Sequence, residues 1–91
     1  KNTLILRNHG LLTLGRSVSE AFRRMIYLDQ ACKLQVSMLA AGRKPSQPPV
    51  EVMEHTAQQW ESGAAGIGTE KSREWPALLR MLDRQDPSWR A

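Results

Sequence analysis

His9 is the residue of this chain best placed to do chemistry. It stands between Asn8 and Gly10 in the stretch LILRNHGLLTLGRS, with strand-like apolar runs on both sides. A loop at the end of a buried strand is where a rigid scaffold commonly holds catalytic and ligating groups. An imidazole there can bind a metal, transfer a proton near neutral pH, or belong to an ordinary tight turn. The residues alone leave these three roles open.

The chain offers His9 few partners for a metal site. A catalytic zinc needs three protein ligands and one open position. The second histidine, His55, has no histidine four residues further along its expected helix, and we interpret it as a surface residue. The single cysteine, Cys32, falls in an apolar helical pattern, so no disulfide forms within the chain and a reducing cytoplasm is the expected compartment. A zinc site at His9 would therefore have to be completed by residues upstream of this chain.

Asp29 is the second residue of interest, because a helical wheel places it in the middle of an apolar face. A buried carboxylate must be paired or protonated. We favour an ion pair with an arginine such as Arg7 or Arg16, or hydrogen bonds from backbone N–H groups. The alternative is that Asp29 accepts a hydrogen bond from His9 and fixes the tautomer of its ring.

Two short strands are expected to hold His9, at residues 3–7 and 11–14. Residues 8–10 would connect them, and Gly10 suits the positive φ with which three-residue hairpin loops commonly end. An isolated two-stranded ribbon is not stable in water, so these strands require a larger sheet.

A long helix is expected at residues 17–41. Ser17 and Glu20 have the spacing of a capping box at its start, and Gly42 is the expected stop. One face carries the apolar side chains Val18, Phe22, Met25, Cys32, Val36 and Leu39, and the opposite face carries Arg23, Gln30, Lys33 and Ser37. Further apolar residues interrupt the polar side, so we expect a neighbouring helix or another subunit to cover more than one flank.

Residues 43–91 are expected to form a linker and a helical extension. In order, the sequence predicts a proline-rich linker at 43–49, a helix at 49–61, a glycine-rich segment at 62–68, a helix at 71–85 with Pro76 in its first turn, and an exposed tail with Trp89. The glycine-rich segment lacks the Gly-Lys-Ser/Thr ending of a phosphate loop and follows no predicted strand, so we interpret it as a linker.

The composition of the 91 residues is that of an ordinary globular protein with a core, with 41% hydrophobic and 24% charged residues. The net charge of +4 comes from scattered basic residues, so we expect no nucleic-acid partner. The absence of an 18-residue apolar run predicts no membrane span. The chain enters an apolar stretch directly after Lys1, and we expect a fragment of a longer protein.

The stretch RNHGLLTLGRSVSEAFRRMIYLDQACKLQ resembles the class II aldolase/adducin family, and the resemblance extends over about residues 4–41. It implies a three-layer α/β/α domain around a mixed, largely antiparallel sheet, of which this chain carries two strands and about three helices. Residues 1–42 would form the C-terminal part of that domain. The resemblance also implies a homo-oligomer, usually a tetramer, with active sites at the subunit interfaces.

For function, the resemblance implies that His9 is the third ligand of a catalytic Zn²⁺, the other two coming from a His-x-His motif earlier in the family's enzymes. The expected activity is that of a zinc-dependent lyase on a small sugar-phosphate-like or hydroxy-carbonyl substrate. The alternatives are an adducin-like, non-catalytic interaction domain and a related zinc-dependent epimerase or dehydratase. Some family members use a C-terminal tyrosine as an acid, whereas the tail of this chain offers Trp89, so the catalytic residues stay unknown.

Overall fold

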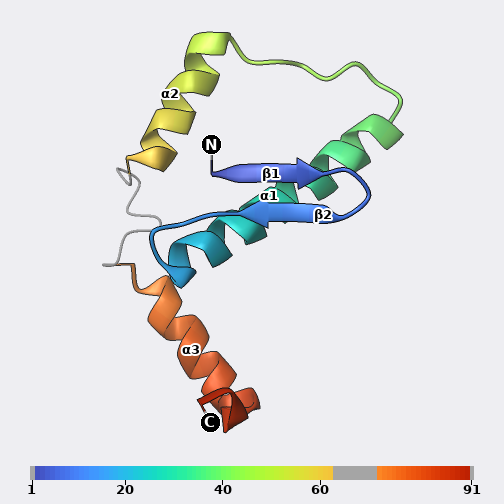
Figure 1. Ribbon diagram of the computed structural model, residues 1–91. Helices are drawn as coiled ribbons and strands as arrows, with labels where there is room; N and C mark the ends of the chain where they lie inside the picture. Colours follow the sequence, from blue (N-terminus) through green and yellow to red (C-terminus); the bar gives the residue numbers. More distant parts are fainter. Residues whose placement is uncertain (1, 63–71, 91) are drawn as a thin grey trace.

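The computed structural model describes residues 2–62 and 72–90. Along the chain its elements are β1 (Thr3–Leu6), β2 (Gly10–Thr13), α1 (Val18–Ala40), α2 (Val50–Glu61), α3 (Glu74–Gln85) and a short 3₁₀ helix (Pro87–Arg90) (Figure 1). The predicted order and types of the two strands and three helices are confirmed, whereas the 3₁₀ helix lies in the segment predicted as an exposed tail. The glycine-rich segment beyond Ser62 and the expected helix start at Lys71 lie outside the described residues.

The two strands form an antiparallel hairpin that is anchored on the first turns of α1. Leu6 pairs with Gly10 at the closed end, and Thr3 pairs with Thr13 at the open end. The Thr13 hydroxyl donates to the carbonyl of Ala21 in α1 over 2.9 Å. Figure 1 shows the hairpin lying along α1. In the described part of the chain the sheet has only these two strands, and Ile5 is 73% exposed.

The start and the end of α1 follow local signals in the sequence. The Ser17 hydroxyl accepts a hydrogen bond from the backbone N–H of Glu20 over 3.2 Å, which is one half of the predicted capping box. The other half is wrong: the Glu20 carboxylate accepts from the backbone N–H of Arg16 instead, at 2.6 Å. Gly42 follows the helix with φ 67°, the left-handed conformation in which glycine commonly ends a helix.

No hydrophobic side chain in the described residues is fully buried, so the expected core is not formed by this part of the chain. On the predicted apolar face of α1, Val18 is 75% exposed and Leu39 62% exposed. The radius of gyration is 16.1 Å, against about 12 Å for a compact domain of this length. An open arrangement of this kind leaves most apolar surface in water, where it contributes little to stability.

None of the helices within residues 2–62 and 72–90 combines the length and the apolar character that a bilayer span requires.

The tail after α3 folds back onto that helix through Asp83. The Asp83 carboxylate accepts from the Arg90 guanidinium at 2.7 and 2.8 Å and from the Trp89 indole N–H at 3.1 Å. These contacts, first of all the hydrogen bond from Arg90, hold the pKa of Asp83 below its ordinary value. The prediction of an exposed tail is confirmed in part, because Trp89 is 43% exposed and yet anchored.

The contact of the tail with Asp83 should depend on pH in one direction. Because folding lowers the pKa of Asp83, the contact is complete at neutral pH and is lost only as the pH falls through the pKa of the folded state. We expect the indole Nε1–H resonance of Trp89 to stay constant from neutral pH down to the ordinary titration range of aspartate and to shift below it. In Asp83→Asn the resonance should be displaced already at neutral pH. An unchanged resonance in that variant would contradict the contact.

Candidate functional site

His9 lies at the tip of the hairpin, in the three-residue turn Arg7–Asn8–His9. The backbone N–H of His9 donates to the carbonyl of Leu6 over 3.2 Å and closes this turn. The predicted connection, residues 8–10, is therefore displaced by one residue, because Gly10 is already the first residue of β2. The positive φ predicted for Gly10 is confirmed at 129°, and Asn8 also has a positive φ, at 60°.

The His9 ring is tied to the backbone of its own turn. Its Nδ1 lies 3.1 Å from the carbonyl oxygen of Arg7. A carbonyl oxygen only accepts, so Nδ1 carries the proton and the lone pair of the neutral ring is on Nε2. The side chain is exposed, and Nε2 has no partner among the described residues. This arrangement matches that of a metal-bound histidine, whose second ring nitrogen usually donates to a carboxylate or a backbone carbonyl.

The described residues place no further ligands beside His9. Within residues 2–62 and 72–90 no group of three His, Cys, Asp or Glu side chains is arranged to hold a metal ion. His55 is exposed on α2, as predicted, and Cys32 is half-buried on α1. One imidazole of suitable geometry is therefore present, and a complete metal site needs donors from elsewhere.

Both interpretations of Asp29 are wrong. Its carboxylate is half-exposed and pairs with the Lys33 ammonium over 2.7 Å, one helical turn further along α1. It pairs with neither Arg7 nor Arg16, and the Nδ1 of His9 donates to a backbone carbonyl instead. The helical wheel predicted a buried carboxylate, but the apolar face around Asp29 is only partly covered by the described residues. An exposed i,i+4 pair of this kind contributes little to stability.

An open hollow with charged walls lies where the hairpin, α1 and α2 meet, and its lining includes Arg16, Glu20, Arg24 and Glu61. The Glu20 carboxylate pairs with Arg24 at 2.9 Å. Its pKa is lowered, chiefly by the hydrogen bond from the Arg16 backbone and then by the charges of Arg24 and Arg16. Arg24 also donates to the carbonyl of Leu14 at 2.6 Å. The Arg24 cation is thus already paired, and the hollow does not have the character of an anion site.

Residues 1–36, which include the hairpin and its histidine, match the family model described as the class II aldolase and adducin N-terminal domain. This segment of the chain belongs to the class II aldolase and adducin family. The similarity of the chain to the bacterial members extends well beyond the part that the family model matches.

Two relatives are bacterial proteins named "putative aldolase class 2 protein". The chain is 39% identical to the one from Pseudomonas aeruginosa over 98% of its own length, and 36% identical to the one from Caulobacter vibrioides, also over 98%. It is 40% identical to rat beta-adducin over 88% of its length. The chain spans 35% and 34% of the length of the two bacterial relatives and 12% of the adducin. No solved structure matches the chain.

Within the family segment, Arg23 is a residue that the sequence pattern misplaced. The helical pattern predicts it on the polar face, yet its side chain is 8% exposed and it is the one fully buried residue of the described chain. Its guanidinium carbon lies 5.3 Å from the ring centre of Tyr27 and 5.1 Å from that of Trp60. Tyr27 belongs to α1 and Trp60 to α2, so the burial of Arg23 depends on helices that meet in space, which no local signal encodes.

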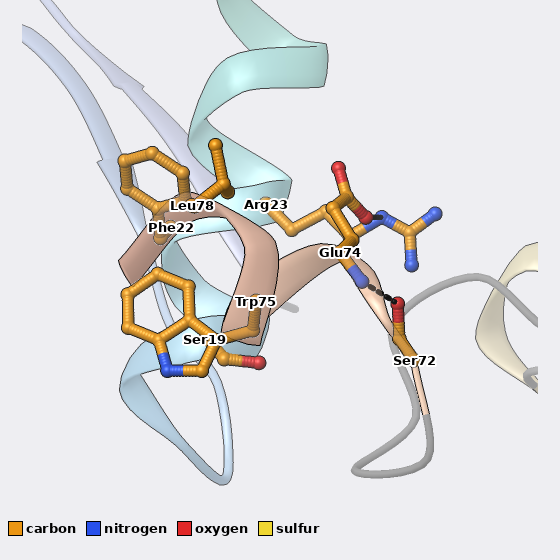
Figure 2. A pocket seen from close by; sticks show the side chains of 7 residues that line it. All are labelled: Ser19, Phe22, Arg23, Ser72, Glu74, Trp75 and Leu78. Atoms are coloured by element: carbon orange, nitrogen blue, oxygen red, sulfur yellow. Dashed lines mark hydrogen bonds and ion pairs between the residues drawn. The ribbon is translucent and has the colours of Figure 1, made fainter. Parts of the chain in front are cut away.

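Arg23 also joins α1 to α3 at a small pocket (Figure 2). Its Nε lies 3.6 Å from the carboxylate of Glu74, and beside it the rings of Phe22 and Trp75 meet edge to face at 5.4 Å. Nε and Nη2 of Arg23 are buried and have no hydrogen-bond partner among residues 2–62 and 72–90. The cavity of about 10 Å³ has room for roughly one water molecule, which excludes a substrate-sized ligand. The pocket is therefore a helix junction within this family member, and His9 stays the candidate for chemistry.

Proposed function

We propose that the full-length protein is a class II aldolase-type lyase in which His9 binds a zinc ion through Nε2. The observation that carries this proposal is the hydrogen bond between Nδ1 of His9 and the carbonyl of Arg7, which leaves the lone pair on Nε2. Family membership of residues 1–36 and the names of the bacterial relatives support it. The two further ligands and the catalytic acid would come from residues outside this chain.

In catalysis this chain would hold the imidazole of His9 rigidly in place as a ligand of the metal ion. The backbone hydrogen bond from His9 to Leu6 closes the turn, the ring is tied to the Arg7 carbonyl, and the hairpin is anchored on α1, so the imidazole needs little reorganisation to bind. A bound zinc ion would supply Lewis-acid polarisation of a substrate carbonyl or hydroxyl oxygen. A small sugar-phosphate-like or hydroxy-carbonyl substrate suits this chemistry. We also propose that the full-length protein has the three-layer α/β/α architecture, because the strands and one face of α1 are exposed in this chain. A cytoplasmic location and a homo-oligomer are further parts of the proposal.

The second candidate function is that of an adducin-like, non-catalytic interaction domain. The 40% identity to rat beta-adducin over 88% of the chain favours it. A domain of this kind would keep the hairpin and α1 without requiring a metal.

Metal analysis of the full-length protein separates the two functions. We expect about one zinc ion per chain in the wild type, a loss of most of it in His9→Ala, and no loss in His55→Ala, which removes an exposed imidazole on α2. Aldol cleavage of hydroxy-carbonyl substrates should fall together with the zinc content. Equal zinc in wild type and His9→Ala would remove His9 from the metal site. A wild type without zinc and without cleavage activity would favour the adducin-like function.

A further inference from the structure

The orientation of the His9 ring depends on the backbone of the residue before it. Asn8 has φ 60°, in the left-handed region that residues other than glycine rarely occupy. The ring of His9 reaches back across Asn8 to the carbonyl of Arg7, 3.1 Å away. The His9 ring and the Arg7 carbonyl thus lie on either side of Asn8, whose φ is unusual.

Geometry links that angle to the hydrogen bond. The Arg7 carbonyl belongs to the peptide group that precedes Asn8, and φ of Asn8 is the rotation that orients this group relative to His9. Changing φ from +60° to the ordinary value near −60° would rotate the Arg7 carbonyl by roughly 120° about the N–Cα bond of Asn8. The acceptor would then leave the His9 ring, and Nδ1 would lose its partner.

We propose that Asn8 is a positioning residue, which fixes the neutral His9 ring in the Nδ1–H tautomer through its left-handed backbone conformation and so presents Nε2 as a ligand. The importance of Nε2 rests on the proposed function, whereas the tautomer itself does not. Without a partner, a neutral histidine in water mostly carries its proton on Nε2, the nitrogen that a metal would need. The turn therefore favours the Nδ1–H tautomer over the ordinarily preferred Nε2–H tautomer before any metal binds.

The choice of asparagine at this position agrees with this role. The Asn8 side chain makes no hydrogen bond with any residue in 2–62 or 72–90, so it acts through its backbone. Asparagine is among the few residues with a side chain that enter the left-handed region readily, and glycine enters it without strain. A β-branched residue is a genuine outlier there. Glycine should thus replace Asn8 in this function, and valine should not.

The test reads the tautomer directly, in the full-length protein labelled with ¹⁵N and stripped of metal. Long-range ¹H–¹⁵N correlation spectra at a pH of about 8.5, where ordinary imidazoles are neutral, show which ring nitrogen carries the proton. We expect the Nδ1–H tautomer of His9 to dominate in the wild type and in Asn8→Gly. In Asn8→Val the Nε2–H tautomer should become the major form, and zinc affinity should fall by roughly tenfold or more. The control is the set of backbone amide shifts of β1 and β2, which should show that the hairpin is retained in Asn8→Val.

Each outcome bears on one of the two proposals. A dominant Nε2–H tautomer in the wild type overturns the inference, and so does an Asn8→Val variant with an intact hairpin that keeps the Nδ1–H tautomer. Loss of the Nδ1–H tautomer in Asn8→Gly also overturns it, because the side chain would then be required. If the tautomer behaves as expected but His9→Ala retains its zinc, the proposed metal site fails and the role of Asn8 in the turn stands.

Discussion

Replacing Gly15 with alanine is expected to lower the free energy of unfolding of the full-length protein by about 3 kcal/mol. Gly15 lies where the chain passes from β2 into α1. A Cβ atom built on it would lie 2.5 Å from the backbone nitrogen of Ala21 and 3.0 Å from the carbonyl oxygen of Ser17. Both are backbone atoms, one of the N-cap residue and one of the first turn of α1, and they cannot rotate away as a flexible side chain would. Urea denaturation measures the loss.

Gly42→Ala is the matched control for this substitution. Gly42 has φ 67°, and no atom of the described residues lies within 4 Å of the position of an added Cβ, so alanine there is strained but not crowded. We expect a loss of about 1 kcal/mol, typical of a left-handed conformation forced on alanine. A loss in Gly15→Ala no larger than in Gly42→Ala would contradict the close approach of the loop to α1.

The second large effect is expected at Arg23, where alanine should lower the free energy of unfolding by about 2 kcal/mol. The substitution removes the aliphatic stem and the guanidinium that lie between Tyr27, Trp60 and Glu74. Methionine should come within about 1 kcal/mol of the wild type, because it fills a similar volume and leaves no buried N–H group without a partner. The charge of Arg23 thus contributes less than its packing.

Arg16→Ala serves as the control, because the Arg16 side chain is 92% exposed. Its effect should stay within about 0.5 kcal/mol. The indole resonances of Trp60 and Trp75 should shift in Arg23→Ala and stay in place in Arg16→Ala. If methionine destabilised the protein as much as alanine does, the ion pair with Glu74 and the contacts with the rings would be the main contribution of Arg23.

The elements that local chemistry determines were predictable from the sequence. The hairpin follows from two apolar runs around a turn with glycine, and α1 from a hydroxyl at its N-cap and a glycine at its end. The positive φ of Gly10 is predictable because three-residue hairpin loops commonly end in such a glycine. The boundary error of one residue at the turn arises because Asn8 as well as Gly10 adopts a positive φ, and a sequence shows only that asparagine tolerates it.

The surroundings of α1 were not predictable in the same way. A helical wheel assumes that one apolar stripe faces a core, and it placed Asp29 inside and Arg23 outside. The structure differs at both positions, because Asp29 is half-exposed and pairs with Lys33 on its own helix, and Arg23 is covered by α2 and α3. Burial by segments distant in the sequence leaves no signal in a periodicity of 3.6 residues. The His9 tautomer is likewise a property of three-dimensional geometry, since it depends on the direction of one carbonyl.

The position of the metal relative to the His9 ring tests the central claim most directly. An anomalous difference map at the zinc edge, from crystals of the full-length protein, locates the ion independently of activity. We expect a peak about 2.0–2.1 Å from Nε2 of His9, with Nδ1 still hydrogen-bonded to the Arg7 carbonyl. A peak at Nδ1, or a zinc ion bound by other residues while His9 stays unligated, would contradict the claim that this turn presents Nε2 to a metal.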